Sequence, residues 1–236
     1  MLVQKNNYAI IKPHTVNNRK ENVMQELTGN GNNYQKLFIA MRYWLIGMAQ
    51  HDKQYLIALK ALEYAKQIHI GFRKDGKTPE FQHQIEITHY LRTLYTGLQY
   101  PAETLAAAFL HDVPEDYDIS FEELESLFGK RVTDAVRLLT KQYRGEKKDM
   151  ETYFEEMAMC PIASVIKGGD RIHNHQTMHP VFTKEKQKSY ILETETYIVP
   201  MLKKARHLHV EQEFIYENIK FVLRSQMVMV KHRLDA

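Results

Sequence analysis

Apolar residues recur three or four positions apart along most of the chain, the spacing that places them on one face of an α-helix. The first clear set follows the polar, glycine-punctuated stretch 29–33, at Leu37, Met41, Trp44, Leu45 and Met48. The same periodicity predicts further helices over 54–70, from Pro79 past Leu91, 101–110, 120–129, 130–140, from Asp149, 161–180, 184–206 and 211–233.

Local signals mark where several of these helices begin and end. Thr78 before Pro79 is a favourable start, because a threonine side chain can cap free amides and proline is preset for the first turn. Ser120 and Glu123 form a capping box for a short amphipathic helix. That helix is expected to stop near Gly129, since glycine favours the backbone that ends a helix.

Two prolines and one charged segment complete the secondary-structure prediction. Pro101 opens a helix whose end, 105–110, is small and apolar enough to be buried on most sides. Pro200 predicts a kink. The segment 142–148 is expected to be a charged loop before a helix capped by Asp149. No convincing strand pattern is found, so the predicted fold class is all-α.

The composition fits an ordinary globular protein. The chain has 236 residues, of which 44% are hydrophobic and 26% charged, enough to bury a substantial core. No apolar run is long enough to span a bilayer, and the N-terminus lacks the apolar core of a signal peptide. We expect a cytoplasmic protein with no membrane partner, divided into an appendage at 1–33, a main domain at 34–205 and a C-terminal helix at 206–236 packed on it.

Charge and cysteine content narrow the function classes. A net charge of +3 is too small to indicate a stable nucleic-acid partner, which usually needs a concentrated basic face. The single cysteine, Cys160, lies in an apolar stretch, where a thiol packs as a small hydrophobe more often than it acts as a nucleophile. The run 227–230 indicates core of a terminal helix or a homo-oligomer interface. Twelve histidines are the more informative excess.

The chemistry concentrates at His111 and Asp112. Two adjacent side chains of metal-ligand type at the end of a buried helix are costly to desolvate unless a divalent cation compensates. The alternative is a helix-terminal histidine beside a solvent-facing aspartate. Glu115 and Asp116 follow one turn later, which favours a functional cluster. Pro114 predicts that the helix ends or turns there.

Four segments in order resemble the hydrolase domain of RelA/SpoT homologues and its small stand-alone relatives. In that family a His-Asp pair is followed by Glu-Asp, as in 111–116 here. The other matching segments are 73–76 with Pro79 and His83, 121–129, and 165–174, which carries Lys-Gly-Gly-Asp-Arg-Ile-His-Asn. The resemblance covers about 50–205 and implies an HD-domain helical bundle with N- and C-terminal additions.

The resemblance also implies a metal centre. Two imidazoles and two carboxylates form a borderline-hard N/O site suited to Mn²⁺, although zinc, iron and magnesium remain open on ligand type. Taken alone, the histidine at 83 could be an ordinary core or surface residue and the aspartate at 170 a salt-bridge partner. The implied ligands are His83, His111, Asp112 and Asp170.

Two further groups of residues are implied by the same resemblance. Glu115 and Asp116 are expected to orient water and transfer a proton, the alternative being a role in solvating the helix end. Cationic and amide side chains should hold the nucleotide and its phosphates, or else be solvated surface groups. These substrate-binding candidates are Arg73, Lys74, Lys167, Arg171 and Asn174.

Three histidines near the implied centre, His173, His175 and His179, need a separate interpretation. One helix face addresses the metal, and Asp170 and Asn174, four positions apart, already occupy it. We therefore expect the three histidines in supporting or surface positions.

Several positions depart from the family pattern. Gln84 stands where proline is usual, Glu80 where tyrosine is common, and Pro114 and Tyr117 where valine and threonine are frequent. Gln176 replaces an arginine that would help to grip phosphate. These departures leave the implied metal ligands intact but bear on the substrate.

The leading hypothesis is metal-dependent hydrolysis of the 3′-pyrophosphate of guanosine tetra- or pentaphosphate, giving GDP or GTP and pyrophosphate. We expect a stand-alone hydrolase, because a chain of this length has no room for a second nucleotidyl-transfer domain. One alternative is the same chemistry on an adenosine alarmone, the 2′-phosphate of NADPH or a deoxynucleotide. The other is a catalytically silent nucleotide-binding regulator.

Overall fold

The computed structural model describes residues 34–235, so the predicted appendage at 1–33 lies outside the described residues. Within 34–235 the chain is almost entirely helical, which confirms the all-α prediction. The first half contains α2 (Tyr34–His51), η1 (Lys53–Tyr55), α3 (Leu56–Ile68), α4 (Phe81–Arg92), η2 (Tyr95–Gly97), α5 (Pro101–Leu110), α6 (Val113–Asp116) and α7 (Phe121–Leu139). The second half contains β1 (Gln142–Tyr143), β2 (Glu146–Lys147), α8 (Met150–Ala158), α9 (Pro161–Val181), α10 (Lys184–Glu193), η3 (Thr194–Ile198), α11 (Val199–Leu208), η4 (Val210–Gln212) and α12 (Glu213–Asp235).

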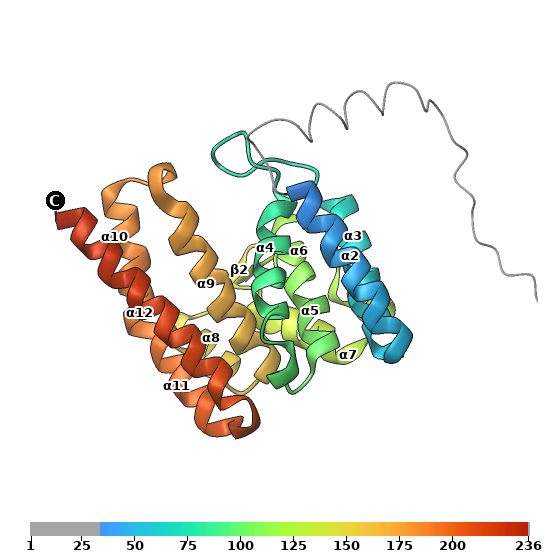
Figure 1. Cartoon of the computed structure of the whole chain (residues 1–236). Coiled ribbons are helices and arrows are strands. Elements are labelled where there is room, and N and C mark those ends of the chain that lie inside the picture. The colour runs from blue at the N-terminus through green and yellow to red at the C-terminus, as the bar shows by residue number, and fades with distance from the viewer. Residues whose placement is uncertain (1–33, 236) are drawn as a thin grey trace, which may run out of the picture.

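The helices form two groups joined through α9. In Figure 1, α2, α3, α4 and α5 gather on one side, while α10, α11 and α12 stand together on the other. The long helix α9 contacts α4 and α5 on its first side and α12 on its second. Residues of α9 therefore lie between the two groups, where they can meet side chains from the first half of the chain.

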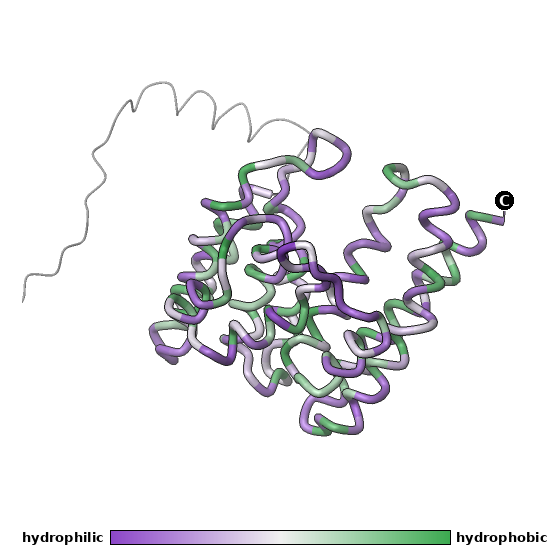
Figure 2. The backbone as a smooth tube through the Cα atoms, turned by 180° about the vertical axis from the view of Figure 1, so that it is seen from behind, coloured by the Kyte–Doolittle hydropathy of each residue, from purple (hydrophilic) through white to green (hydrophobic). Residues whose placement is uncertain are grey.

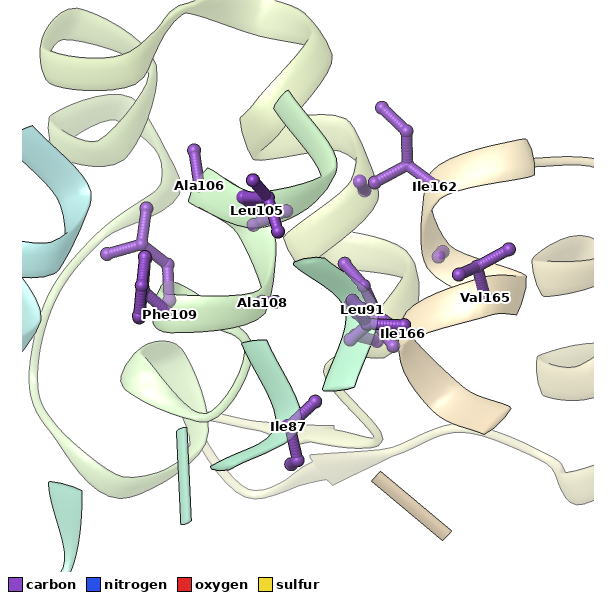
Figure 3. Packing of buried hydrophobic residues seen from close by; sticks show 14 of the residues in the cluster. Ile87, Leu91, Leu105, Ala106, Ala108, Phe109, Ile162, Val165 and Ile166 are labelled. Carbon is purple, nitrogen blue, oxygen red and sulfur yellow. The ribbon is translucent and has the colours of Figure 1, made fainter. Parts of the chain in front are cut away.

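One continuous core lies beneath this arrangement. Figure 3 shows side chains of α4, α5 and α9 packed together, among them Ile87, Leu91, Phe109 and Ile166. All four are buried. Burial of a side chain of this size contributes roughly 1.5–3 kcal/mol. The three helices that carry or immediately precede the implied metal ligands are thus held together by apolar contacts.

The C-terminal helix lies directly against α9. A Cβ atom on Gly168 would stand 2.6 Å from Cγ2 of Ile219 in α12, so the two helices approach closely only because this residue has no side chain. Met227 and Val230 are buried in a second small cluster with residues of α9 and α10. Val228 and Met229, between them, are 55% and 71% exposed, so half of the apolar run 227–230 serves the core.

Several of the expected helix boundaries are confirmed. Ser120 caps α7, its hydroxyl accepting a hydrogen bond from the Glu123 amide. Gly129 breaks α7 with φ 75° and ψ 166°, a conformation that favours glycine. Asp149 caps α8 by accepting from the Thr152 amide.

The start predicted at Thr78 and Pro79 is wrong. The helix α4 begins at Phe81, because Pro79 is still extended and pairs with Phe72 in an antiparallel bridge. Asp75 uses its carboxylate to accept from the amides of Lys77 and Thr78 and from the Thr78 hydroxyl. The Thr78 hydroxyl therefore closes the loop that precedes α4.

The expectation of no strands is also wrong, although narrowly. Segment 142–148 contains a two-stranded hairpin in which Gln142 pairs with Lys147. Its turn has Arg144 at φ 49° and Gly145 at φ 87°, as a tight hairpin turn with two left-handed residues requires. Two-residue strands are too short to produce an alternating pattern that can be recognised in a sequence.

Near Pro200, where the sequence predicts a kink, the structure has a π-helical segment, η3, immediately before α11. Proline has no N–H to donate to the preceding turn, so the helical hydrogen-bond spacing widens there.

Hydrophobic and hydrophilic residues follow one another along the helical parts of the backbone in Figure 2. Over 34–235, none of the helices combines the length and the apolar character that crossing a bilayer requires.

Candidate metal centre

The four implied ligands come together from three elements. His83 lies on α4, His111 and Asp112 on the turn after α5, and Asp170 on α9. One ligand atom from each of His83, His111 and Asp112 lies within 4.8 Å of the others. Asp170 joins them, since its Oδ1 is 3.3 Å from Nε2 of His83. The structure therefore groups ligand atoms of His83, His111 and Asp112, with the Asp170 carboxylate beside His83.

The imidazole of His111 is oriented for a ligand. Its Nδ1 lies 2.9 Å from the carbonyl oxygen of Ala108, which can only accept, so Nδ1 carries the proton and Nε2 a lone pair. This Nε2 is buried and has no hydrogen-bond partner. It lies 3.2 Å from Oδ2 of Asp112, another acceptor. A buried lone pair facing a carboxylate is unfavourable, and a divalent cation between them would satisfy both.

The two acids of the site differ in their protonation preference. Burial raises the pKa of Asp112, and the nearby Asp170 raises it further. Burial also opposes ionisation of Asp170, but the positive charge of Lys167 and the nearby imidazole of His83 outweigh it and hold the pKa of Asp170 well below its usual range. One carboxylate is thus charged already, and the other gains most from a bound cation.

Glu115 and Asp116 occupy different surroundings, although they are adjacent. Oε1 of Glu115 accepts from the backbone amides of Lys141 and Gln142, so this side chain also joins α6 to the hairpin. Burial, with Asp112 nearby, raises the pKa of Asp116 to about 6. Asp116 can therefore exchange a proton near neutral pH, which suits a general acid or base.

Three of the implied substrate-binding residues border the metal ligands. Asn174 donates to Oδ1 of Asp170 over 2.6 Å and accepts from the Arg73 guanidinium over 3.5 Å. Lys167 lies 3.0 Å from the other oxygen of Asp170. Lys167 thus contacts the carboxylate directly and Arg73 is linked to it through Asn174, at a place where phosphate oxygens could replace part of these interactions.

The other two implied substrate-binding residues, Lys74 and Arg171, do not border the metal ligands in this way. Lys74 is exposed and lies above the ring of Phe182, 5.4 Å from its centroid. Arg171 is buried, pairs with Glu193 and donates to the carbonyl oxygen of Tyr190 over 3.2 Å. The expectation that Arg171 binds substrate needs correction, because its charge is used to join α9 to the helix that follows.

Two more polar side chains lie beside the ligands: Gln84, whose contact the sequence did not reveal, and His173, which was expected in a supporting or surface position. Gln84 is buried and donates from Nε2 to Oδ2 of Asp112 over 3.1 Å. His173 is buried too, with Nδ1 2.9 Å from Nδ1 of His83. The one usable signal for His173 is its spacing, because residues three positions apart share a helix face and His173 follows Asp170 by three.

A family model described as HD domain matches residues 61–200. The chain belongs to the HD domain family. This HD domain is 28% identical over 163 residues to a probable guanosine-3′,5′-bis(diphosphate) 3′-pyrophosphohydrolase of Synechocystis, covering 66% of this chain and 21% of the relative. It is 33% identical over 148 residues to a GTP pyrophosphokinase of Streptomyces coelicolor, covering 60% of this chain and 17% of the relative.

A solved structure is similar over a larger share of its own length. It is a metazoan ortholog of SpoT described as hydrolysing ppGpp and playing a role in starvation responses, with a TM-score of 0.55 and 28% identity over 69% of this chain and 93% of that chain. The resemblance to RelA/SpoT homologues is thereby confirmed. The HD-domain chain spans only about a fifth of the length of the curated relatives it matches, and those relatives are named for two opposite reactions.

Proposed function

We propose that this HD domain hydrolyses the 3′-pyrophosphate of guanosine tetra- or pentaphosphate and releases pyrophosphate with GDP or GTP. The observation that carries the proposal is the buried, unpartnered Nε2 of His111, which faces the same space as ligand atoms of His83 and Asp112. The similar solved protein is described as hydrolysing ppGpp. The match covers 93% of that solved chain, so its described activity supports hydrolysis over synthesis more directly than the names of the much longer relatives do.

His83, His111, Asp112 and Asp170 would hold the cation, and Mn²⁺ suits their mixture of imidazole nitrogen and carboxylate oxygen. When bound, such an ion acts as a Lewis acid toward a phosphoryl oxygen and lowers the pKa of water. Gln84 restrains one oxygen of Asp112, so that the carboxylate keeps its orientation.

Asp116 is the residue we assign to proton transfer. Its carboxyl has a pKa of about 6, so it is largely ionised at neutral pH and can accept a proton from the attacking water. Glu115 holds the neighbouring hairpin through the Lys141 and Gln142 amides. We assign Glu115 to fixing the position of α6 through this contact and, as the resemblance implies, to orienting water.

Recognition of the substrate falls to the cations beside Asp170. Arg73 contacts Asn174 and Lys167 contacts Asp170, and Lys74 extends the positive charge along the loop before α4. Guanidinium and ammonium groups bind phosphate oxygens by charge-assisted hydrogen bonds. A substrate with two adjacent phosphates fits this distribution of charge.

The test is product analysis with purified protein and Mn²⁺. Guanosine tetraphosphate should be converted to GDP and pyrophosphate, and Asp112→Ala should abolish this by removing a ligand. Asp134→Ala serves as a matched control, because Asp134 is partly exposed and pairs with Lys130.

The same assay should include an adenosine alarmone, NADPH and a deoxynucleotide. Turnover of one of these with none of the guanosine compound would replace the proposal by another HD-type hydrolase. Tight nucleotide binding without any product, under each divalent metal tried, would indicate a regulator.

A further inference from the structure

A chain of hydrogen bonds leads away from His83 on the side opposite to the other ligands. Nδ1 of His83 lies 2.9 Å from Nδ1 of His173. Nε2 of His173 lies 2.7 Å from Oε2 of Glu86. Gln82, one turn earlier on α4, donates to Oε1 of Glu86 over 2.6 Å. Both carboxylate oxygens of Glu86 are thus used, one by Gln82 and one by His173.

The chemistry of these groups assigns the protons along the chain. The Glu86 carboxylate only accepts, so Nε2 of His173 carries a hydrogen. In a neutral imidazole the other nitrogen then has a lone pair, and Nδ1 of His173 accepts from Nδ1 of His83. His83 is left with a bare Nε2, which lies 3.6 Å from Asp112 Oδ2 and 3.3 Å from Asp170 Oδ1.

The other neutral form of His83, with its hydrogen on Nε2, could not bind a cation through that nitrogen. If His83 carried its hydrogen on Nε2, it would donate to Asp170, whose Oδ1 is 3.3 Å away. That hydrogen bond is favourable in itself but removes the lone pair a cation needs. His83 is 3% exposed, so solvent has little part in deciding between the two forms.

We propose that Glu86 and His173 are positioning residues that hold His83 in the tautomer with a bare Nε2, and thereby set the metal affinity of the site. The inference rests on the proposed metal-dependent function. His111 is held in the equivalent form by a backbone carbonyl. A ligand imidazole commonly donates its second N–H to a carboxylate or carbonyl, and here a second histidine lies between ligand and carboxylate.

The hydrogen-bonded series His83–His173–Glu86, called the relay below, can be altered without removing the packing that holds α4 against α9. The helices α4 and α9 also meet through Gly169, where an added Cβ would lie 3.4 Å from Leu91 and 3.5 Å from Ile87. His175, two residues beyond His173, is equally buried but lies on Thr194, with Nε2 3.1 Å from its hydroxyl. His175 therefore offers a matched control on the same helix.

The first experiment measures Mn²⁺ affinity of the full chain by calorimetry. We expect His173→Phe, which fills the space but accepts nothing, to weaken binding roughly 10- to 100-fold, the usual effect of removing a partner of a metal ligand. Glu86→Gln keeps an acceptor and should lie at the lower end of that range. His173→Gln, whose amide oxygen can accept from His83, should restore part of the affinity, and His175→Gln should bind as wild type does.

The second experiment observes the tautomer without any metal. Long-range proton–nitrogen NMR of histidine-labelled protein should show His83 protonated at Nδ1 in the wild type and shifted toward Nε2 in His173→Phe. Wild-type affinity in both His173→Phe and Glu86→Gln, or a wild-type His83 protonated at Nε2, would overturn the inference.

The two proposals fail in different ways. Wild-type protein that binds Mn²⁺ but cleaves no alarmone would remove the proposed function while leaving the relay measurable through affinity and tautomer. Equal Mn²⁺ affinity in wild type and relay variants, with alarmone hydrolysis intact, would remove the relay alone.

Discussion

The hydroxyl of Tyr117 donates to Oε2 of Glu80 over 2.6 Å, joining the residue after α6 to the residue before α4. Both residues depart from the family pattern, and along the sequence they lie far apart and look unrelated. In the structure they form one hydrogen-bonded pair. Burial and the bond to Glu80 raise the pKa of Tyr117, so its hydroxyl remains a donor at all physiological pH values. The contact ties the loop carrying Arg73 to the segment carrying Asp116.

This pair should show measurable coupling. Tyr117→Phe and Glu80→Gln each remove one partner, and a double-mutant cycle on urea unfolding should give an interaction free energy of about 1–2 kcal/mol, since hydrogen bonds to charged groups exceed neutral ones. Additive effects of the two substitutions would show that the contact contributes nothing.

Asp112→Asn should separate the stability of the metal-free protein from metal binding. The Asp112 carboxylate is partly buried, and desolvation with the nearby Asp170 opposes its ionisation, so the neutral amide should raise the melting temperature without metal. Wild-type protein should gain roughly 2.7 kcal/mol when Mn²⁺ is 100-fold above its Kd. The variant should lose that gain, and a chelator should affect wild type alone in thermal unfolding scans.

Asp116 should determine the acidic limb of the pH–activity profile. Its pKa is about 6 in the free protein, and a base must be ionised, so kcat/KM should fall as the pH drops below about 6 and level off above it. Asp116→Asn should lower kcat roughly 10²- to 10⁴-fold, the usual contribution of general acid–base catalysis, and remove this limb. An unchanged profile in the variant would assign the ionisation to another group.

His69 should make the fold sensitive to acid. Burial lowers its pKa from 6.5 to about 4, and neither ring nitrogen has a hydrogen-bond partner. Above pH 6.5 both folded and unfolded chains carry neutral His69. Between pH 6.5 and about 4 only the unfolded chain takes up the proton, so stability falls as pH falls, by at most about 1.4 kcal/mol per pH unit.

His69→Phe tests this dependence. The ring stacks on Phe81 and meets Tyr117 edge-on, contacts that phenylalanine can keep. The variant should match wild type near pH 7.5 and be more stable near pH 5 in urea unfolding. The same pH slope in both proteins would exclude His69 as the cause.

Loss of charge should reduce stability at Arg171 and substrate binding at Arg73. Arg171→Gln removes the buried cation and breaks its ion pair with the partly exposed Glu193, which should cost about 1–3 kcal/mol of stability. Arg73→Gln should leave the melting temperature nearly unchanged and raise KM roughly 10- to 100-fold, the equivalent of one charge-assisted hydrogen bond. A normal KM in Arg73→Gln would remove it from the substrate site.

Short-range features could be predicted from the sequence. Helical periodicity, the Ser120 and Asp149 caps and the break at Gly129 depend on residues within one or two turns, and the structure contains each of them. His111 and Asp112 could be singled out for the same reason, since adjacent ligand-type residues at the end of an apolar helix are visible locally. The two-residue strands and the Pro79 bridge could not, because their pairing partners lie across a loop.

Only the tertiary structure decided which side chains surround the centre and which do not. His83, Asp170 and His173 meet because α4 and α9 pack against each other across about 90 residues of chain, and Arg171 faces away because one helix cannot direct neighbouring residues to one side. Helix periodicity is a property of the local backbone, whereas the orientation of α9 toward α4 depends on apolar contacts such as those of Gly169 with Leu91 and Ile87. Those contacts place the imidazoles and carboxylates together.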